Sequence, residues 1–283
     1  MSGGDNISMG VATAVARHSV EVQRGSNGWY ADVQQDLLAL EVPVALVYNG
    51  ISHAVMMATP ADLEEFALGF SLSEGILAHP HECYDLEVGE EAHGLAVRLT
   101  ISNQRLAALK DRRRSLAGRT GCGLCGTEAL EQAIRPIPRV TAPLLSDTAI
   151  QRSLDQLAQY QPLQAVTGAT HCAAWCDGQG RLQVVREDVG RHNALDKLIG
   201  ALADRSRDTL DGFALISSRA SYEMVHKCAK VGIGALVAVS AATHLAVTQA
   251  NEANLLLVGF ARPGRHTTYN NPTTGSTPKT KEA

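Results

Sequence analysis

Two cysteines separated by two residues are the clearest chemical signal in the chain. Cys122 and Cys125 lie in a glycine-rich stretch, which follows the arginine-rich residues 112–119 and precedes a helix expected over residues 127–134. The thiolate is the reactive form of cysteine, and guanidinium groups and a helix N-terminus both lower a thiol pKa. Three chemistries fit this pair: a redox dithiol, half of a zinc site, or a nucleophile that carries a group such as sulfane sulfur.

The other cysteines are weaker candidates. His171, Cys172 and Cys176 could complete a zinc site with the first pair, but the two cysteines lie in an apolar run, which favours packing. Cys228 and Cys83 are expected in the core. The sequence therefore predicts no resident metal, although a zinc-stabilised binding protein that never moves sulfur stays open as an alternative.

The C-terminal half shows the pattern of a sheet covered by helices. Strand-like segments at 182–185, 213–216, 235–239 and 255–258 alternate with helical segments near 192–205, 220–231 and 244–253. Strands separated by helices indicate parallel crossovers. We therefore expect an α/β unit.

Polar residues follow every one of these strands, and three of the four strand ends carry arginine. Because ligands of open α/β sheets bind beyond the carboxyl ends of the strands, Arg191, His192, Ser218 and Arg219 are candidates for an anionic, phosphate-bearing ligand. Simpler roles compete: Ser218 could only cap a helix, and Arg191 could only pair with Glu187.

The N-terminal half predicts a smaller α+β unit. Residues 42–48 and 51–57 flank Asn49-Gly50, the pair favoured in tight hairpin turns. Thr59 is expected to cap a helix that has Pro60 in its first turn. We divide the chain into a flexible arm (1–28), an N-terminal α+β domain ending in the thiol loop (29–134), a C-terminal α/β domain that binds the anionic ligand (140–269) and a polar tail (270–283).

Composition narrows the class of protein. The chain has 283 residues, is 45% hydrophobic and has a net charge of -4, which argues against general binding to nucleic acid. Six scattered cysteines indicate a reducing compartment, and the first residues lack the pattern of an export signal. The most apolar region, 233–247, is interrupted by polar residues, so no membrane span is expected. These features predict a cytoplasmic protein.

Six stretches together resemble one known family, the formate dehydrogenase accessory sulfurtransferases, or FdhD family. They are residues 42–50, 66–75, 118–126, 187–197, 217–224 and 258–260, and the likeness runs from about residue 40 to 269. The resemblance implies a C-terminal α/β/α sandwich of the cytidine-deaminase type and a homodimer. A nucleobase deaminase is disfavoured, because the H-x-E plus P-C-x-x-C set is absent.

The resemblance also implies a function. A cysteine desulfurase would hand sulfane sulfur to the chain, which would deliver it to the bis-molybdopterin guanine dinucleotide form of the molybdenum cofactor before insertion into formate dehydrogenase. Cys122 would carry the persulfide, with Cys125 as its partner. The residues matching the family's cofactor-binding stretch are Phe260, Ala261, Arg262, Pro263, Gly264 and Arg265, and guanosine diphosphate would mimic the cofactor. Cys172 and Cys176 depart from the small or aliphatic residues that many members have.

Overall fold

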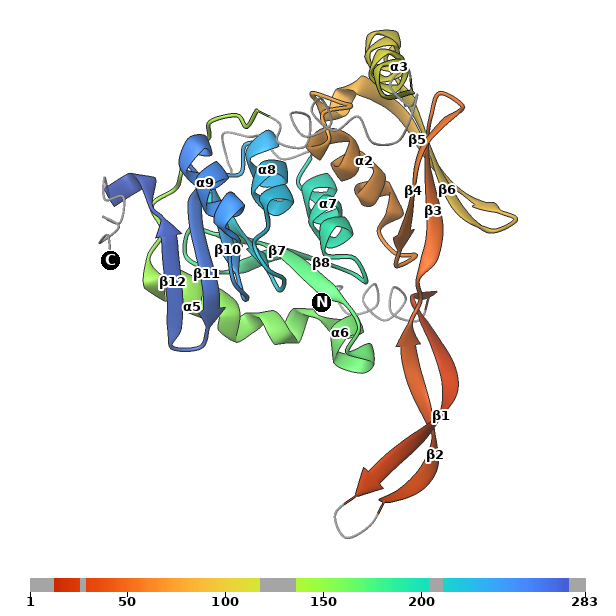
Figure 1. The fold of residues 1–283 in the computed structure, drawn as a ribbon, viewed down its shortest axis with the longest axis vertical. Coiled ribbons are helices and arrows are strands. Elements are labelled where there is room, and N and C mark those ends of the chain that lie inside the picture. Colours follow the sequence, from red (N-terminus) through yellow and green to blue (C-terminus); the bar gives the residue numbers. More distant parts are fainter. Residues whose placement is uncertain (1–12, 26–28, 118–135, 204–210, 275–283) are drawn as a thin grey trace, which may run out of the picture.

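The computed structural model describes residues 13–25, 29–117, 136–203 and 211–274, which form a mixed α/β fold (Figure 1). A six-stranded sheet and a four-stranded sheet lie at the two sides of this body. Helices α2 (Leu63–Ser73) and α7 (Arg191–Ala201) pack against each other between them. The predicted fold class, a C-terminal α/β/α sandwich with a smaller N-terminal α+β part, is confirmed.

The six-stranded sheet has the order β12-β11-β10-β9-β7-β8. Its strands are β7 (His171–Asp177), β8 (Leu182–Asp188), β9 (Gly212–Ile216), β10 (Ala235–Ala238), β11 (Leu256–Arg262) and β12 (Arg265–Asn270). Strands β8 to β11 run in one direction, and β7 and β12 run against them. The carboxyl ends of four strands therefore meet at one edge, as the strand and helix pattern predicts, whereas β7 and β12 were not predicted.

Helices cover both faces of this sheet. Alternate residues of β9 and β10 point to opposite sides: Ile216 and Leu236 contact one hydrophobic cluster, and Phe213 and Val237 contact another. The first cluster includes α7, α8 (Tyr222–Lys230) and α9 (His244–Ala253). The second includes α5 (Asp147–Leu157), which is followed by η2 (Ala158–Tyr160) and α6 (Pro162–Thr167). Because both faces are covered, the inner strands are apolar throughout.

The four-stranded sheet has the order β4-β3-β6-β5, formed by β3 (Val42–Tyr48), β4 (Ile51–Ala58), β5 (Cys83–Glu91) and β6 (Gly94–Ile101). Asn49 and Gly50 both have positive φ, 46° and 79°, so the predicted tight turn between β3 and β4 is confirmed. The short helix η1 (Pro80–Glu82) precedes β5, and α3 (Asn103–Ala117) follows β6.

The predicted start of α2 is wrong. The helix begins at Leu63 and its N-cap is Asp62, which has the left-handed φ of 53°. Thr59 is fully buried and serves a tertiary contact instead: its N–H donates to Asp188 Oδ2 at 3.0 Å, and its Oγ1 accepts from the N–H of Val189 at 3.1 Å. Bonds to a distant strand thus take the place of the local cap.

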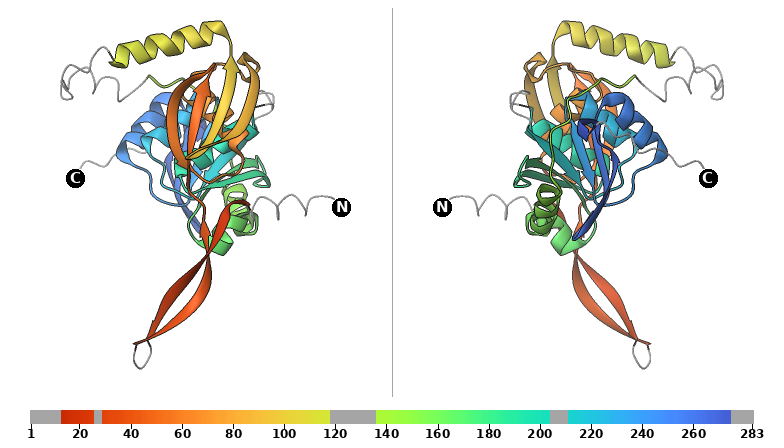
Figure 2. Two further views of the ribbon diagram at one scale, coloured as in Figure 1. Left: turned by 90° about the vertical axis from the view of Figure 1, so that its right-hand side faces the viewer. Right: turned by 90° about the vertical axis from the view of Figure 1, so that its left-hand side faces the viewer.

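A long hairpin projects from the body, as Figures 1 and 2 show. Its strands are β1 (Val15–Gly25) and β2 (Trp29–Ala39), which pair antiparallel over their whole length. The expectation of an arm without regular structure is therefore wrong over Val15–Gly25. Helix α6 contacts β2, and the N–H of Leu40 donates to Ala14 O where the hairpin joins the body.

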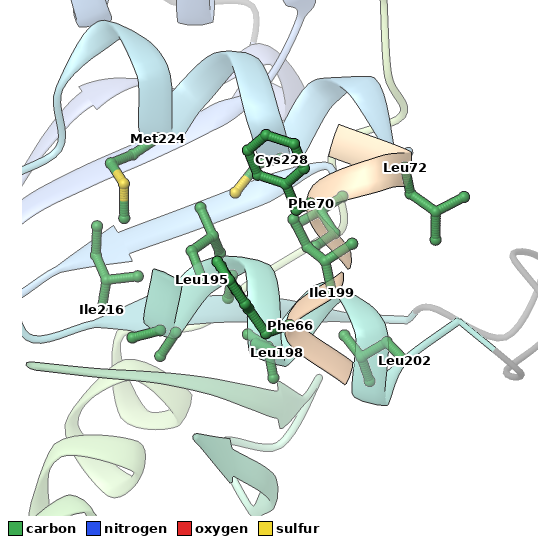
Figure 3. Close-up of a cluster of buried hydrophobic side chains, with 14 of the residues drawn as sticks. Phe66, Phe70, Leu72, Leu195, Leu198, Ile199, Leu202, Ile216, Met224 and Cys228 are labelled. Atoms are coloured by element: carbon green, nitrogen blue, oxygen red, sulfur yellow. The ribbon is translucent and has the colours of Figure 1, made fainter. Parts of the chain in front are cut away.

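The close crossing of α2 and α7 depends on two glycines. A Cβ at Gly69 would lie 1.8 Å from the backbone oxygen of Asp196, and a Cβ at Gly200 would lie 1.9 Å from that of Glu65. No side chain fits at either position, so the two backbones meet directly. Figure 3 shows Phe66 and Phe70 of α2 in the same cluster as Leu195 and Leu198 of α7 and Leu202, which follows that helix.

Buried ion pairs accompany this crossing. Lys227 of α8 donates to both carboxylate oxygens of Asp196 and to Ser73 Oγ, each at 2.9 Å, and its Nζ lies 3.2 Å from Glu74 Oε1. The ammonium also lies 5.3 Å from the centre of the Phe70 ring. Residues from α2, α7 and α8 are therefore joined by charge as well as by apolar packing.

Candidate functional site

The thiol segment has its described flanks at one end of the molecule. Cys122 and Cys125 lie outside the described residues, and the chain leaves the described part after Ala117, at the end of α3. Where it resumes, the N–H of Val140 donates to Ala253 O at the C-terminal end of α9. This second flank lies at the amino ends of the parallel strands, opposite their carboxyl edge.

The carboxyl edge brings the predicted anion-binding segments together. Ala220, which follows β9, forms a parallel bridge with Ala242, which follows β10. The N–H of Phe260 in β11 donates to Ser240 O at 2.9 Å, so the end of the next strand adjoins the same loop. The prediction that these segments share one edge is confirmed.

Helix α7 presents an open N-terminus at this edge. Its N-cap, Gly190, offers no side chain to its N–H groups. Arg191 Nε is buried and, within the described residues, has no hydrogen-bond partner. His192 Nε2 lies 2.6 Å from Glu223 Oε2 on α8. Burial, opposed by the Glu223 carboxylate, holds the pKa of His192 below its ordinary value. Unpaired donors at a helix N-terminus suit an anion.

Helix α8 begins beside it in the same way. Ser221 is its N-cap, yet its side chain caps no helix N–H, and its buried Oγ has no hydrogen-bond partner among the described residues. Ser218 is buried and donates to the carbonyl of Arg219 at 3.2 Å, whereas the Arg219 side chain is exposed. Of these two predicted residues, Arg219 is therefore the one with a side chain accessible to a ligand.

His171 is a residue at this edge that the sequence did not indicate for it. It begins β7, which runs against β9, so its position adjoins the carboxyl edge, and its Nδ1 lies 3.4 Å from Ser217 Oγ. Burial and the neighbouring Arg191 guanidinium lower the pKa of His171. A neutral imidazole can donate from one ring nitrogen and accept at the other. The only signal in the sequence was a histidine before an apolar run.

The predicted cofactor stretch spans the end of β11, the turn after it and the first residue of β12. Phe260 is half-buried with a left-handed φ of 49°, and the Ala261 methyl packs in the core. Arg262 and Arg265 are exposed and are paired across the turn. The residues between them, Pro263 and Gly264, are also exposed, and the N–H of Gly264 donates to Gln151 Oε1 of α5 at 2.7 Å. The turn is thus held to α5 by a hydrogen bond and exposes two guanidinium groups.

Several neighbouring polar residues have structural roles. Glu187 accepts from the N–H groups of Leu163 and Gln164 at 2.9 and 2.8 Å, so the alternative in which it pairs with Arg191 is wrong. Asp188 lies 2.7 Å from Lys197 Nζ, and both side chains are fully buried. These carboxylates fix the position of β8 and are not available to a ligand.

The remaining cysteines serve packing. Cys172 and Cys176 are buried in the cluster beneath α5, and burial raises the pKa of Cys172 to about 12. Cys228 is fully buried, as predicted, whereas Cys83 is only half-buried. In the part of the chain that the structure describes, no three His, Cys, Asp or Glu side chains are grouped to hold a metal ion. No described helix is long and apolar enough to cross a membrane.

Comparisons with known proteins agree with this architecture. The FdhD/NarQ family profile matches residues 39–274. A protein of Cupriavidus necator named Sulfur carrier protein FdhD is 58% identical over 242 residues, which cover 84% of this chain and 83% of that protein. One of the same name from Bordetella petrii is 52% identical over 86% of this chain and 87% of its own.

A solved structure supports the fold. It is that of a candidate formate dehydrogenase accessory protein from Desulfotalea psychrophila, with a TM-score of 0.69 and 23% sequence identity, covering 92% of this chain and 98% of that one. At 23% sequence identity, this match shows the fold alone. The family profile and the relatives above half identity together show that this chain belongs to the FdhD/NarQ family.

Proposed function

We propose that the chain is a sulfur carrier in the maturation of formate dehydrogenase. The observation that carries this proposal is the match, across 84% and 86% of the chain, to two relatives named Sulfur carrier protein FdhD. The chain also has the thiols that such a role needs, Cys122 and Cys125. Cys122 is the residue that carries sulfur.

Loading is a thiol exchange. The Cys122 thiolate attacks the terminal sulfur of a cysteine persulfide on a desulfurase. One S–S bond forms on Cys122 as the donor's S–S bond breaks, and the donor cysteine leaves as a thiolate. The product is Cys122-S-SH. The arginines of residues 112–119 favour the attacking thiolate by stabilising its charge.

Delivery requires two electrons, because sulfane sulfur must become sulfide. The Cys125 thiolate attacks the sulfur of Cys122 that is bonded to carbon, a Cys122–Cys125 disulfide forms, and the terminal sulfur leaves as hydrosulfide. The bis-molybdopterin guanine dinucleotide molybdenum cofactor is the substrate that receives it. A dithiol reductant then restores both thiols.

We assign the nucleotide end of that substrate to the carboxyl edge of the large sheet. Support comes from the exposed guanidinium groups of Arg219, Arg262 and Arg265 and from the unpaired Arg191 Nε at the open N-terminus of α7. Guanidinium groups and helix N-termini both bind pyrophosphate oxygens well. Phe260 offers a ring for a guanine base. Guanosine diphosphate is the corresponding probe.

The same role implies its partners. A cysteine desulfurase supplies the sulfur and formate dehydrogenase is the final recipient, so we place the chain in the cytoplasm, where thiols stay reduced. We also propose that it acts as a homodimer, in line with the family resemblance. No nucleic acid and no membrane take part.

A complementation experiment tests the role of Cys122. A bacterial strain that lacks its own carrier of this family is given the wild-type chain, Cys122→Ala, or Cys172→Ala as a matched control. We expect formate dehydrogenase activity with the wild type and the control, and none with Cys122→Ala, although the variant accumulates to the same level. Normal activity with Cys122→Ala would refute the proposed carrier.

A further inference from the structure

A groove with a volume of about 680 Å³ opens beside the outer strand of the four-stranded sheet. Its walls are mixed in polarity and come from α2, η1, β5 and the residues after α7: apolar Leu68, Pro80, Leu86 and Ala203 lie with polar His81 and Asp85. Tyr84 lies at this groove with 67% of its surface exposed. An open groove that combines apolar residues with an exposed aromatic residue is typical of a site that receives a side chain of a partner protein.

The strand beside the groove has a free edge. Strand β5 is the last strand in the order β4-β3-β6-β5, so its outer edge pairs with no other strand of the described chain. Such an edge offers a row of backbone N–H and C=O groups, which an extended segment of another protein can pair with as an added strand.

The charged residues of β5 are all acidic. The strand contains Asp85, Glu87, Glu90 and Glu91 and no lysine or arginine. Glu91 pairs with Arg98, but the other three are exposed and form no ion pair with described residues. Carboxylates on edge strands also discourage pairing between identical copies. That role alone does not account for the adjoining groove, whereas a partner segment with an apolar side chain between cations accounts for both features.

The groove lies beside the start of α3, the helix that precedes the thiol segment. Glu82 of η1 accepts from Arg105 Nε at 2.8 and 2.9 Å, which ties the groove's surroundings to the first turn of α3. Helix α3 leads directly to the segment that holds Cys122. Figures 1 and 2 show α3 at the opposite end of the molecule from the β1–β2 hairpin.

We propose that β5 and its groove dock the sulfur-donating protein through an extended segment that has an apolar side chain between lysines or arginines. The apolar side chain fills the groove, the backbone pairs with the free edge of β5, and the cations meet Asp85 and Glu87. This inference rests on the proposed sulfur-carrier function. The sulfur donor and the cofactor then bind at different places on the protein. The donor binds near α3, and the nucleotide end of the cofactor binds at the carboxyl edge of the large sheet.

The test compares two sulfur sources for the full-length protein. Wild type, Asp85→Lys, Glu87→Lys and Tyr84→Ala are loaded either by a purified cysteine desulfurase with cysteine or by glutathione persulfide, and the gain of sulfur is followed by intact mass. Asp155→Lys, an exposed charge reversal on α5, is the matched control. We expect the three groove variants to load from the desulfurase about tenfold more slowly at low salt, because charge reversal slows association and Tyr84→Ala removes an aromatic contact. High salt should narrow the difference for the charge reversals.

Glutathione persulfide should load all the proteins equally, since it needs no docking site. Groove variants that load from the desulfurase as fast as wild type would overturn the docking site, and so would variants that are slow with both donors. A change of oligomeric mass in the variants, with normal loading, would assign the groove to a second copy and overturn the proposal. Wild type that gains sulfur from neither donor would instead refute the sulfur carrier itself.

Discussion

Replacing Lys227 by methionine tests the ionic contact that joins α2, α7 and α8. Burial alone would lower the pKa of Lys227, but the carboxylates of Asp196 and Glu74 outweigh burial and raise that pKa. The lysine is therefore charged in the folded protein at neutral pH. Methionine keeps the unbranched chain over the Phe70 ring and removes only the charge and the donors.

The cost follows from what the substitution leaves behind. The side chain of Asp196 is 2% exposed, and without Lys227 it keeps the hydrogen bond from Ser73 Oγ at 2.7 Å. Breaking a buried ion pair on one side costs about 3–5 kcal/mol. Burial raises the pKa of Asp196, and loss of the lysine raises it further, so the folded variant takes up a proton as the pH falls. The deficit relative to wild type is therefore full above the raised pKa of Asp196 and shrinks as the pH falls through it.

Urea unfolding, followed by far-UV circular dichroism at several pH values, measures this effect. Lys227→Met should lose about 3–5 kcal/mol of unfolding free energy at pH 8 and less at pH 5, whereas Lys227→Met/Asp196→Leu should recover most of the loss because no unpaired charge remains. A single variant that loses under about 1 kcal/mol, or a double variant whose loss equals the sum of the two single losses, would refute the reasoning.

Three further outcomes are expected. Gly200→Ala should destabilise the fold by about 3 kcal/mol in the same urea assay, because its Cβ would overlap the backbone oxygen of Glu65; an unchanged midpoint would contradict the close crossing. Arg265→Glu should weaken binding of guanosine diphosphate about tenfold by calorimetry, with Arg181→Glu as the unaffected control; equal affinities would move the site elsewhere. The Cys172 thiol, whose pKa burial raises to about 12, should resist Ellman's reagent at pH 8 in the folded protein; rapid reaction there would contradict its burial.

Much of the large sheet was predictable because its elements repeat a local pattern. Strands β8, β9 and β10 are each followed by a helix, α7, α8 and α9, and this order alone puts Arg191 and Arg219 at a common edge. The turn at Asn49-Gly50 was also predictable, since few residue pairs accept two positive φ values.

The missed elements depend on contacts far along the chain. Strand β7 is buried on both faces, so its residues show no alternation, and His171 gains its place beside Arg191 only through pairing with β9. The β1–β2 hairpin projects into solvent and mixes polar and apolar residues on both faces, so no single apolar face marks its strands in the sequence. Thr59 fits the local pattern of a helix N-cap, but in the structure it forms hydrogen bonds with Asp188 and Val189 instead.

The central claim is that sulfur is carried covalently on Cys122, and intact mass spectrometry tests it most directly. The purified chain is incubated with a cysteine desulfurase and cysteine, then digested to locate the modification. We expect one added sulfur atom on the peptide that contains Cys122, its loss on treatment with dithiothreitol, and no gain in Cys122→Ser. A chain that never gains sulfur, or gains it equally in Cys122→Ser, would contradict the account.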